Sequence, residues 1–178
     1  MTTSDDAYMT PQGLLQRIHD EREALAATWG ALTMEQLVQR PGPQDDWSVK
    51  DLIAHVTRWE SFILQRVTDL MDGVPSKPAE PHDVLNARAY RQNRDRPLAE
   101  VLAAFDANWP RLVMLLTSLN EEQLNAPAYY PTYDGVALLP ILRAGTYGHY
   151  PSHMTDLRTY AARLASRPEG EGDRNQEL

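Results

Sequence analysis

Hydrophobic residues recur at steps of three and four positions in four long stretches of the chain, the spacing of an α-helix with one buried face. These stretches cover about residues 11–29, 48–72, 97–116 and 136–164, and a shorter helix is expected over about residues 84–94. Segments rich in proline and glycine separate them, and none shows the strict alternation of a β-strand. The pattern predicts an all-α fold, a four-helix bundle with up-down-down-up or up-down-up-down topology.

Local signals mark where some of these helices begin or bend. Ser48 followed by Asp51 is a variant of the capping box and predicts the start of the second long helix, with Trp47 as the apolar residue before the cap. Pro110 and Pro151 fall inside predicted helices. Because proline lacks the amide proton that a helix interior uses, we expect a kink or a break at each.

The length of 178 residues is enough for one domain with its own core. We expect the bundle to occupy residues 10–165, between a flexible N-terminus at 1–9 and a flexible, polar C-terminal tail at 166–178. The first nine residues do not have the pattern of a signal peptide, and no apolar run reaches the roughly 20 residues of a membrane helix. The sequence predicts a cytoplasmic protein with no membrane partner.

Charge and cysteine content limit the kinds of partner and chemistry. The chain has 17 Lys and Arg against 25 Asp and Glu, a formal net charge of −8 and a pI near 5.0. Nucleic-acid phosphates require a basic surface, so the sequence predicts no nucleic-acid partner. The chain contains no cysteine, which excludes disulfides, thiolate metal ligands and a cysteine nucleophile.

Three histidines are the candidate metal ligands. His149 and His153 are four residues apart, so a helix would place them one above the other, and His55 falls on the buried face of another helix. Three imidazoles with an open fourth position are typical of a catalytic metal site. They suit zinc, nickel, iron or copper better than magnesium or calcium, and we expect zinc or nickel first. The alternative is that they are hydrogen-bonded core residues. His19 and His82, in polar and proline-rich surroundings, are expected to be solvated.

Two segments resemble a known protein family. One is similar to the start of the second helix in DinB-like four-helix bundles: Trp47-Ser48-Val49-Lys50-Asp51-Leu52-Ile53-Ala54-His55-Val56. The other contains the His-x-x-x-His of that family and most resembles its ClbS/DfsB branch: Thr146-Tyr147-Gly148-His149-Tyr150-Pro151-Ser152-His153. The resemblance covers nearly the whole chain, from about Pro11 to Leu164. It implies a divalent metal held by His55, His149 and His153, and a homodimer.

The resemblance also implies chemistry on reactive small molecules. The ClbS/DfsB branch is associated with opening an electrophilic cyclopropane by water, whereas other relatives resemble thiol S-transferases or mycothiol-dependent isomerases. We therefore expect a metal-dependent enzyme that detoxifies an electrophilic small molecule by adding water, like a self-resistance hydrolase, or a low-molecular-weight thiol. The alternative is a non-catalytic bundle that binds and sequesters a small molecule.

Further residues are candidates for supporting roles. Glu60 and Asp156 are the acidic residues nearest the three histidines in sequence, and we expect them either to orient a metal ligand or to be solvated charges. An aromatic set is expected either to line the mouth of a substrate site or only to pack the end of the bundle: Trp59, Tyr129, Tyr130, Tyr133 and Tyr147.

The prediction of a homodimer has a weaker basis in the sequence itself. Four apolar residues lie off the predicted buried faces and are expected to contribute to an exposed apolar patch: Leu15, Leu37, Val38 and Leu139. Such a patch often marks an interface between copies of a chain. The alternative is a monomer kept apart from its copies by its polar tails at 1–9 and 166–178 and by its net charge.

Overall fold

The computed structural model describes residues 8–44, 46–74, 80–127 and 137–166, and the regular structure in these segments is helical. The helices are α1 Pro11–Gly30, α2 Met34–Val38, α3 Val49–Met71, α4 His82–Asn93, α5 Leu98–Ser118, α6 Glu121–Asn125, α7 Leu138–Gly145 and α8 Tyr150–Ala165. None of the described helices is long and apolar enough to cross a membrane. The predicted tails lie outside the described residues, apart from Tyr8, Met9 and Ser166.

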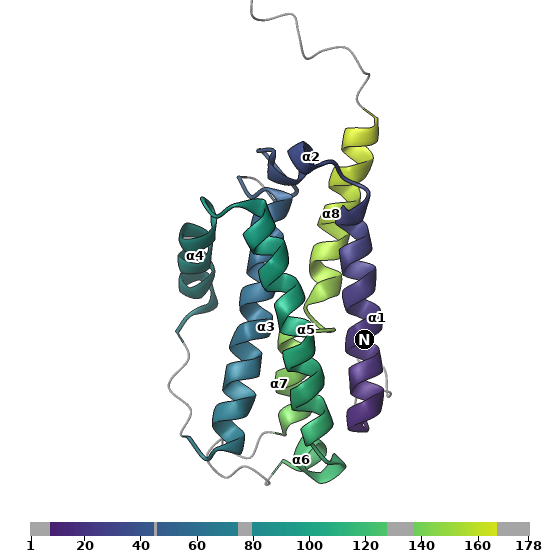
Figure 1. Cartoon of the computed structure of the whole chain (residues 1–178), viewed down its shortest axis with the longest axis vertical. Helices are drawn as coiled ribbons and strands as arrows, with labels where there is room; N and C mark the ends of the chain where they lie inside the picture. Colours follow the sequence, from purple (N-terminus) through teal and green to yellow (C-terminus); the bar gives the residue numbers. More distant parts are fainter. Residues whose placement is uncertain (1–7, 45, 75–79, 128–136, 167–178) are drawn as a thin grey trace, which may run out of the picture.

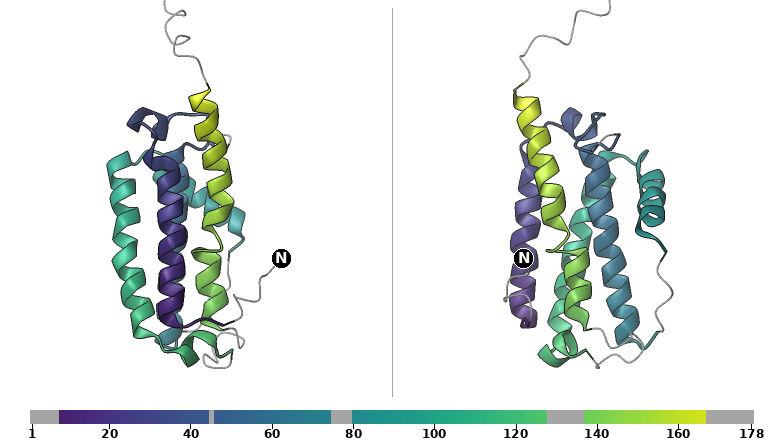
Figure 2. Two further views of the ribbon diagram at one scale, coloured as in Figure 1. Left: turned by 90° about the vertical axis from the view of Figure 1, so that its right-hand side faces the viewer. Right: turned by 180° about the vertical axis from the view of Figure 1, so that it is seen from behind.

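The bundle has four positions, filled by α1, α3, α5 and the α7–α8 pair (Figure 1). Along the chain these run up, down, down and up, so the all-α four-helix bundle is confirmed with the first of the two expected topologies. The parallel pair α3 and α5 requires a crossover, and α4 runs back along the outside of α3 to provide it (Figures 1 and 2). This places α4 beside the bundle rather than within it.

The start of α3 follows the predicted capping box. The Ser48 side chain accepts a hydrogen bond from the Asp51 amide, and the Asp51 carboxylate accepts one from the Ser48 amide at 2.9 Å. Arg40 donates to the same carboxylate at 2.8 Å, which ties the preceding loop to the helix end. Two orphan amides are thereby satisfied at the end of the helix that carries His55.

Helix α5 begins after Pro97, as predicted, and continues past Pro110 to Ser118, so the break considered at Pro110 is absent. The single long C-terminal helix predicted over residues 136–164 is, in contrast, wrong. It is two helices, α7 and α8, separated by a turn at residues 146–149.

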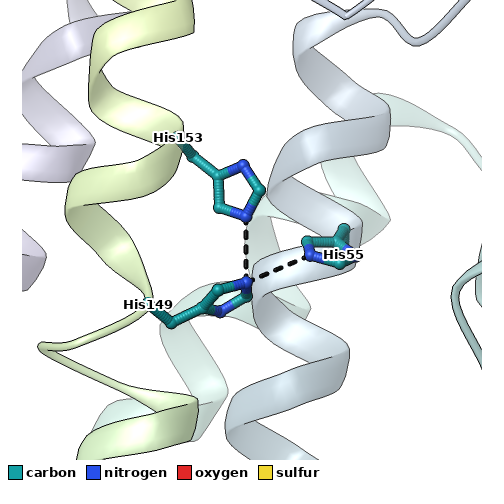
Figure 3. Close-up of side chains that lie close together, drawn as sticks. All are labelled: His55, His149 and His153. Atoms are coloured by element: carbon teal, nitrogen blue, oxygen red, sulfur yellow. Dashed lines mark hydrogen bonds between the residues drawn. The ribbon is translucent and has the colours of Figure 1, made fainter. Parts of the chain in front are cut away.

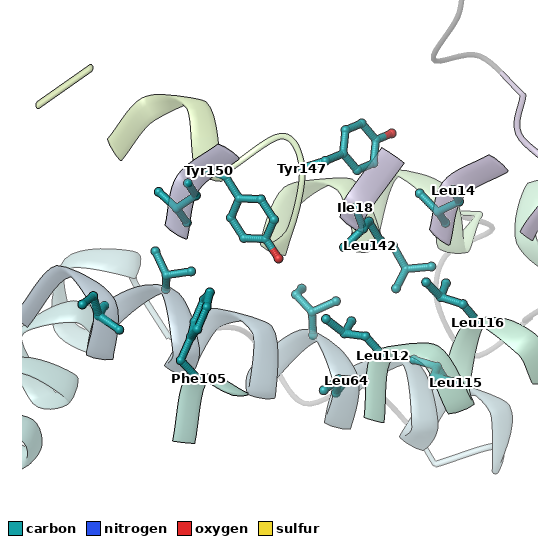
Figure 4. Packing of buried hydrophobic residues seen from close by; sticks show 14 of the residues in the cluster. Leu14, Ile18, Leu64, Phe105, Leu112, Leu115, Leu116, Leu142, Tyr147 and Tyr150 are labelled. Atoms are coloured by element: carbon teal, nitrogen blue, oxygen red, sulfur yellow. The ribbon is translucent and has the colours of Figure 1, made fainter. Parts of the chain in front are cut away.

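The core lies between the four bundle positions, where apolar side chains from α1, α3, α5, α7 and α8 meet (Figure 4). Leu37 and Leu139 belong to this core, with 5% and 4% of their surface exposed. Their assignment to an exposed patch was therefore wrong, because α2 and α7 turn these residues inward. Leu15 is half-buried, and Val38 is exposed.

Candidate metal centre

His55, His149 and His153 converge on one point, although 94 residues separate the first from the second (Figure 3). His55 lies in the second turn of α3, while His149 and His153 lie at the start of α8. Nε2 of His149 is 3.2 Å from Nε2 of His55 and 2.9 Å from Nε2 of His153. His55 and His153 are buried and His149 is half-buried, so the cluster lies at the edge of the core.

The turn between α7 and α8 keeps the two C-terminal histidines one turn apart. His149 is the N-cap of α8 and has αR backbone angles, so the i, i+4 spacing still places both rings on the same side. Pro151 lies in the first turn of α8, where its missing amide proton would have no helical partner. The Thr146 carbonyl accepts hydrogen bonds from the amides of His149 and Tyr150, at 2.7 and 3.1 Å. The turn is thus a hydrogen-bonded joint.

The surroundings keep the three imidazoles neutral. Burial, and then the mutual repulsion of the rings if protonated, lowers the pKa of His55 to about 3 and that of His149 to about 4. Burial also lowers the pKa of His153, and the nearby Asp156 carboxylate opposes that change. At neutral pH each ring therefore has one nitrogen lone pair available.

The donor set fits a divalent ion of the zinc or nickel type. At metal–nitrogen bonds of about 2.0–2.1 Å, two imidazole nitrogens lie about 2.8–3.0 Å apart at a right angle and about 3.3–3.4 Å apart in a tetrahedron. The observed separations of 2.9 and 3.2 Å fall in this range. The Nδ1 atoms of all three rings are buried and have no hydrogen-bond partner among the described residues. The described polar contacts of these rings are thus among their Nε2 atoms, where one ion would bond all three.

A cavity of about 740 Å³ opens beside the three histidines. Trp59 lines it with its ring centroid 6.0 Å from that of His149, and its indole nitrogen donates to Asn86 of α4 at 3.1 Å. Trp47 stacks on Tyr90 and meets the His55 ring edge-on, with centroids 5.2 and 5.5 Å apart. The other described lining residues are Gln44, Phe62, Ile63, Arg66, His82, Pro140, Ile141, Ala144 and Ser152.

Sequence reasoning placed Trp59 at this site but missed most of the other lining residues. Phe62 and Arg66 continue the helical spacing that starts at His55 and Trp59, so the periodicity of α3 was sufficient to find them. His82 was expected to be solvated, and it is exposed, but it lies at the cavity with its ring 5.1 Å from Trp59. Nothing in the local sequence indicates that α4 packs there. His19, also expected in solvent, is half-buried against a tryptophan of α5.

Tyr147, one of the tyrosines predicted to line the site, is not among the described residues that line the cavity. Tyr147 is buried on another side of the α7–α8 joint, with its hydroxyl 3.9 Å from Met9 Sδ and the Arg17 guanidinium near its ring. Tyr129, Tyr130 and Tyr133 lie outside the described residues.

Glu60 belongs to a buried polar network inside the bundle. Its carboxylate accepts hydrogen bonds from Tyr150 Oη at 2.6 Å, Arg22 Nε at 3.1 Å and Asn108 Nδ2 at 3.1 Å. The side chain is 0% exposed, so it is not the solvated charge considered above, and none of these bonds reaches a histidine of the cluster. Burial raises the pKa of Glu60, while Arg22 and the three hydrogen bonds oppose that rise.

Asp156 is placed closer to the cluster. It is half-buried, lies one turn after His153 on α8, and accepts a hydrogen bond from Gln44 Nε2 at 2.6 Å. Gln44 lines the cavity, so Asp156 connects the His153 side of the cluster with the cavity wall.

Solved structures with the same fold include DfsB, described as a sibling lethal factor precursor, and the colibactin self-resistance protein ClbS. DfsB is 17% identical, with 88% of this chain and 98% of DfsB covered at a TM-score of 0.76. ClbS is 17% identical, with 85% of this chain and 95% of ClbS covered at a TM-score of 0.71. An uncharacterised protein from Escherichia coli UTI89 is 14% identical, with 91% and 98% covered at a TM-score of 0.73.

The ClbS structure overturns one prediction. It is a complex with a double-stranded DNA, so a protein of this fold is found on nucleic acid. The exclusion of a nucleic-acid partner from the net charge was therefore wrong. Net charge sums over the whole surface, whereas a nucleic acid contacts only a part of it.

Comparison at the level of sequence identifies the family. No protein with a curated description matches the chain. The sequence model of the DinB superfamily matches residues 17–150, a span that includes His55 and His149. The resemblance inferred from the two motifs is confirmed: this chain belongs to the DinB superfamily.

Proposed function

We propose that this protein is a metal-dependent enzyme that adds water or a low-molecular-weight thiol to an electrophilic small molecule. The observation that carries the proposal is the convergence of three neutral imidazoles beside an apolar cavity of about 740 Å³. Cavities of this size accept drug-sized ligands, and three protein ligands leave positions open for water, thiol or substrate. The chain has no cysteine, so the nucleophile would come from solvent or from a thiol cofactor.

Each part of the site would have a distinct task. A zinc or nickel ion, when bound, supplies a Lewis acid that lowers the pKa of a bound water or thiol toward neutrality. His55, His149 and His153 would hold the ion. Trp47 and Trp59 present apolar ring surface that would exclude bulk water and orient a planar or aliphatic substrate. Asp156, through its charge near His153, would favour tight binding of the ion.

Metal content is the first test. The protein is expressed without a histidine tag, purified without a nickel resin and analysed by mass spectrometry of its metals. We expect about one equivalent of a divalent ion, reduced at least tenfold in His149→Ala and unchanged in the matched control His19→Ala, because His19 lies outside the cluster. Less than a tenth of an equivalent, unaltered by added zinc or nickel, would overturn the proposal.

Turnover is the second test, and it separates catalysis from sequestration. An enzyme would convert several equivalents of an activated cyclopropane or epoxide, with water or with a thiol, and His149→Ala would remove this activity while keeping the fold. A sequestering protein would bind one equivalent and release it unchanged. The apolar cavity alone favours this second candidate as well.

Duplex DNA belongs among the ligands to be tested, because ClbS is described both as a self-resistance protein and as a complex with double-stranded DNA. Fluorescence anisotropy of a labelled duplex at low and moderate salt measures such binding directly. A homodimer and a cytoplasmic location stay predictions from the sequence and the resemblance.

A further inference from the structure

Helix α4 contributes polar rather than apolar side chains to the cavity. His82 and Asn86, four residues apart on this helix, are the residues through which it lines the cavity. Among the described residues of α4 only Ala89 is buried, although the helix packs against α3. Since a helix on the surface of a bundle usually covers its neighbour with large apolar residues, the polar residues at the cavity call for a role of their own.

The Asn86 side chain is oriented by Trp59. The indole nitrogen of Trp59 can only donate a hydrogen bond, and it donates to Oδ1 of Asn86 at 3.1 Å. The other branch of the amide is therefore Nδ2, which has two protons to donate. Within the described part of the chain, the bond from Trp59 is the one hydrogen bond of the Asn86 side chain, which is half-buried. The cavity wall thus has a donor of fixed orientation without a described acceptor.

The indole of Trp59 also lacks a stacked partner among the described rings. Four of them lie beside it at interplanar angles of 67–81°: His55, Phe62, His82 and His149. None of the four lies flat on the indole, whereas Trp47 has such a partner in Tyr90, at an interplanar angle of 8°. Aromatic rings pair well in an offset stack. A flat ligand ring would therefore make with Trp59 a contact that no described side chain makes.

We propose that the ligand of this cavity is an aromatic carbonyl compound. Its carbonyl oxygen accepts a hydrogen bond from Nδ2 of Asn86, and its ring lies against Trp59. Asn86 is then the residue that determines specificity, because a ligand without an acceptor would leave its donor unpaired in the cavity. The inference rests on the proposed function in taking this compound to be the electrophile. The hydrogen bond itself needs no metal.

The test uses the full-length chain and two probes of nearly the same shape, 2-acetylnaphthalene and 2-isopropenylnaphthalene, in which a methylene group replaces the carbonyl oxygen. Equilibrium dialysis measures both affinities. We expect the wild type to bind the ketone more tightly than the alkene. Asn86→Asp keeps an oxygen for Trp59 but replaces the donor by an acceptor, so the ratio of ketone to alkene affinity should fall at least tenfold. Asn86→Leu, which is uncharged and similar in size, should lower the ratio as well.

The matched control is Gln92→Glu, which makes the same change from amide to carboxylate at an exposed position of α4 and should leave the ratio unchanged. Circular dichroism shows whether each variant keeps the helical fold, and the affinity for the alkene shows whether its cavity is intact. The proposal is overturned by a wild type that does not prefer the ketone, or by a preference that survives both Asn86 substitutions.

Metal content and turnover are measured separately from this preference, so the two proposals can fail independently. A protein that selects the ketone but holds no ion and turns nothing over would overturn only the proposed enzyme. A protein that holds the ion and is catalytic, but binds the ketone and the alkene alike, would overturn only this inference.

Discussion

The histidine cluster should make the metal-free protein unstable in mild acid. In the unfolded chain each histidine takes up a proton as the pH falls through about 6.5. In the folded protein the pKa is about 3 for His55 and about 4 for His149, so both rings stay neutral. The unfolded state then binds more protons, and lowering the pH favours it. The stabilisation is complete above pH 6.5 and is lost progressively toward pH 4 for His149 and toward pH 3 for His55.

The magnitude follows from the pKa values. At pH 5, protonation of each of these two histidines stabilises the unfolded chain by about 2 kcal/mol. Each pH unit below the unfolded pKa of about 6.5 contributes about 1.4 kcal/mol. The two together lower the free energy of unfolding by about 4 kcal/mol between pH 8 and pH 5. His153, whose pKa is also lowered, adds to the loss. A domain of this size has about 5–15 kcal/mol in total, so the effect is large.

Urea unfolding of protein treated with EDTA, followed by circular dichroism at pH 8 and pH 5, measures the loss. Carboxylates also titrate in acid, so the informative quantity is the difference between the wild type and His149→Gln. The variant should lose about 2 kcal/mol less than the wild type over this range. His19→Gln, which removes a histidine outside the cluster, should behave like the wild type. If His149→Gln lost as much stability as the wild type, the assignment of neutral buried imidazoles would be refuted.

Three further predictions concern the packing around the site. Arg22→Met should lower the free energy of unfolding by about 3–5 kcal/mol at pH 7, because the buried Glu60 carboxylate loses its countercharge; urea denaturation measures this, and a loss below 1 kcal/mol would contradict it. Tyr150→Phe removes the hydroxyl that donates to Glu60 and should cost about 1–3 kcal/mol in the same assay, whereas no change would show that the bond is not stabilising. Gly145→Ala should cost about 1–3 kcal/mol by forcing α7 away from Ile63, and because Ile63→Ala removes the overlapping Cγ1 atom, the double variant should lose less than the sum of the two single losses; an unaffected Gly145→Ala would disprove the close contact.

Features decided by neighbouring residues were predictable from the sequence. The start of α3 was one, because the Ser48–Asp51 box is complete within four residues. The position of His149 and His153 on the same side of a helix was another, since it depends only on helical spacing. The short helices α2 and α6 were overlooked although their signals are equally local: α2 has the Thr33–Gln36 box and α6 the Asn120–Gln123 box.

Features decided by tertiary packing were not predictable. Glu60 has the sequence context of a surface charge on α3. Arg22 and Tyr150 from other helices donate hydrogen bonds to its carboxylate, which offset the cost of burying the charge. The joint that ends α7 at Gly145 is another such feature, because the helical spacing of apolar residues continues across it. The contribution of α4 to the cavity depends on a crossover whose path no local signal specifies.

The joint at residues 146–149 divides the last bundle position into two helices, α7 and α8, which contribute different parts of the site. One wall of the cavity belongs to α7, through Pro140, Ile141 and Ala144, while the candidate metal ligands His149 and His153 belong to the start of α8. Substitutions in α7 can therefore reshape which molecules fit without moving the atoms that would bind the ion. In the proposed enzyme, substrate selectivity and the metal centre would therefore be adjustable separately, which would make the fold a convenient starting point for engineering new specificities.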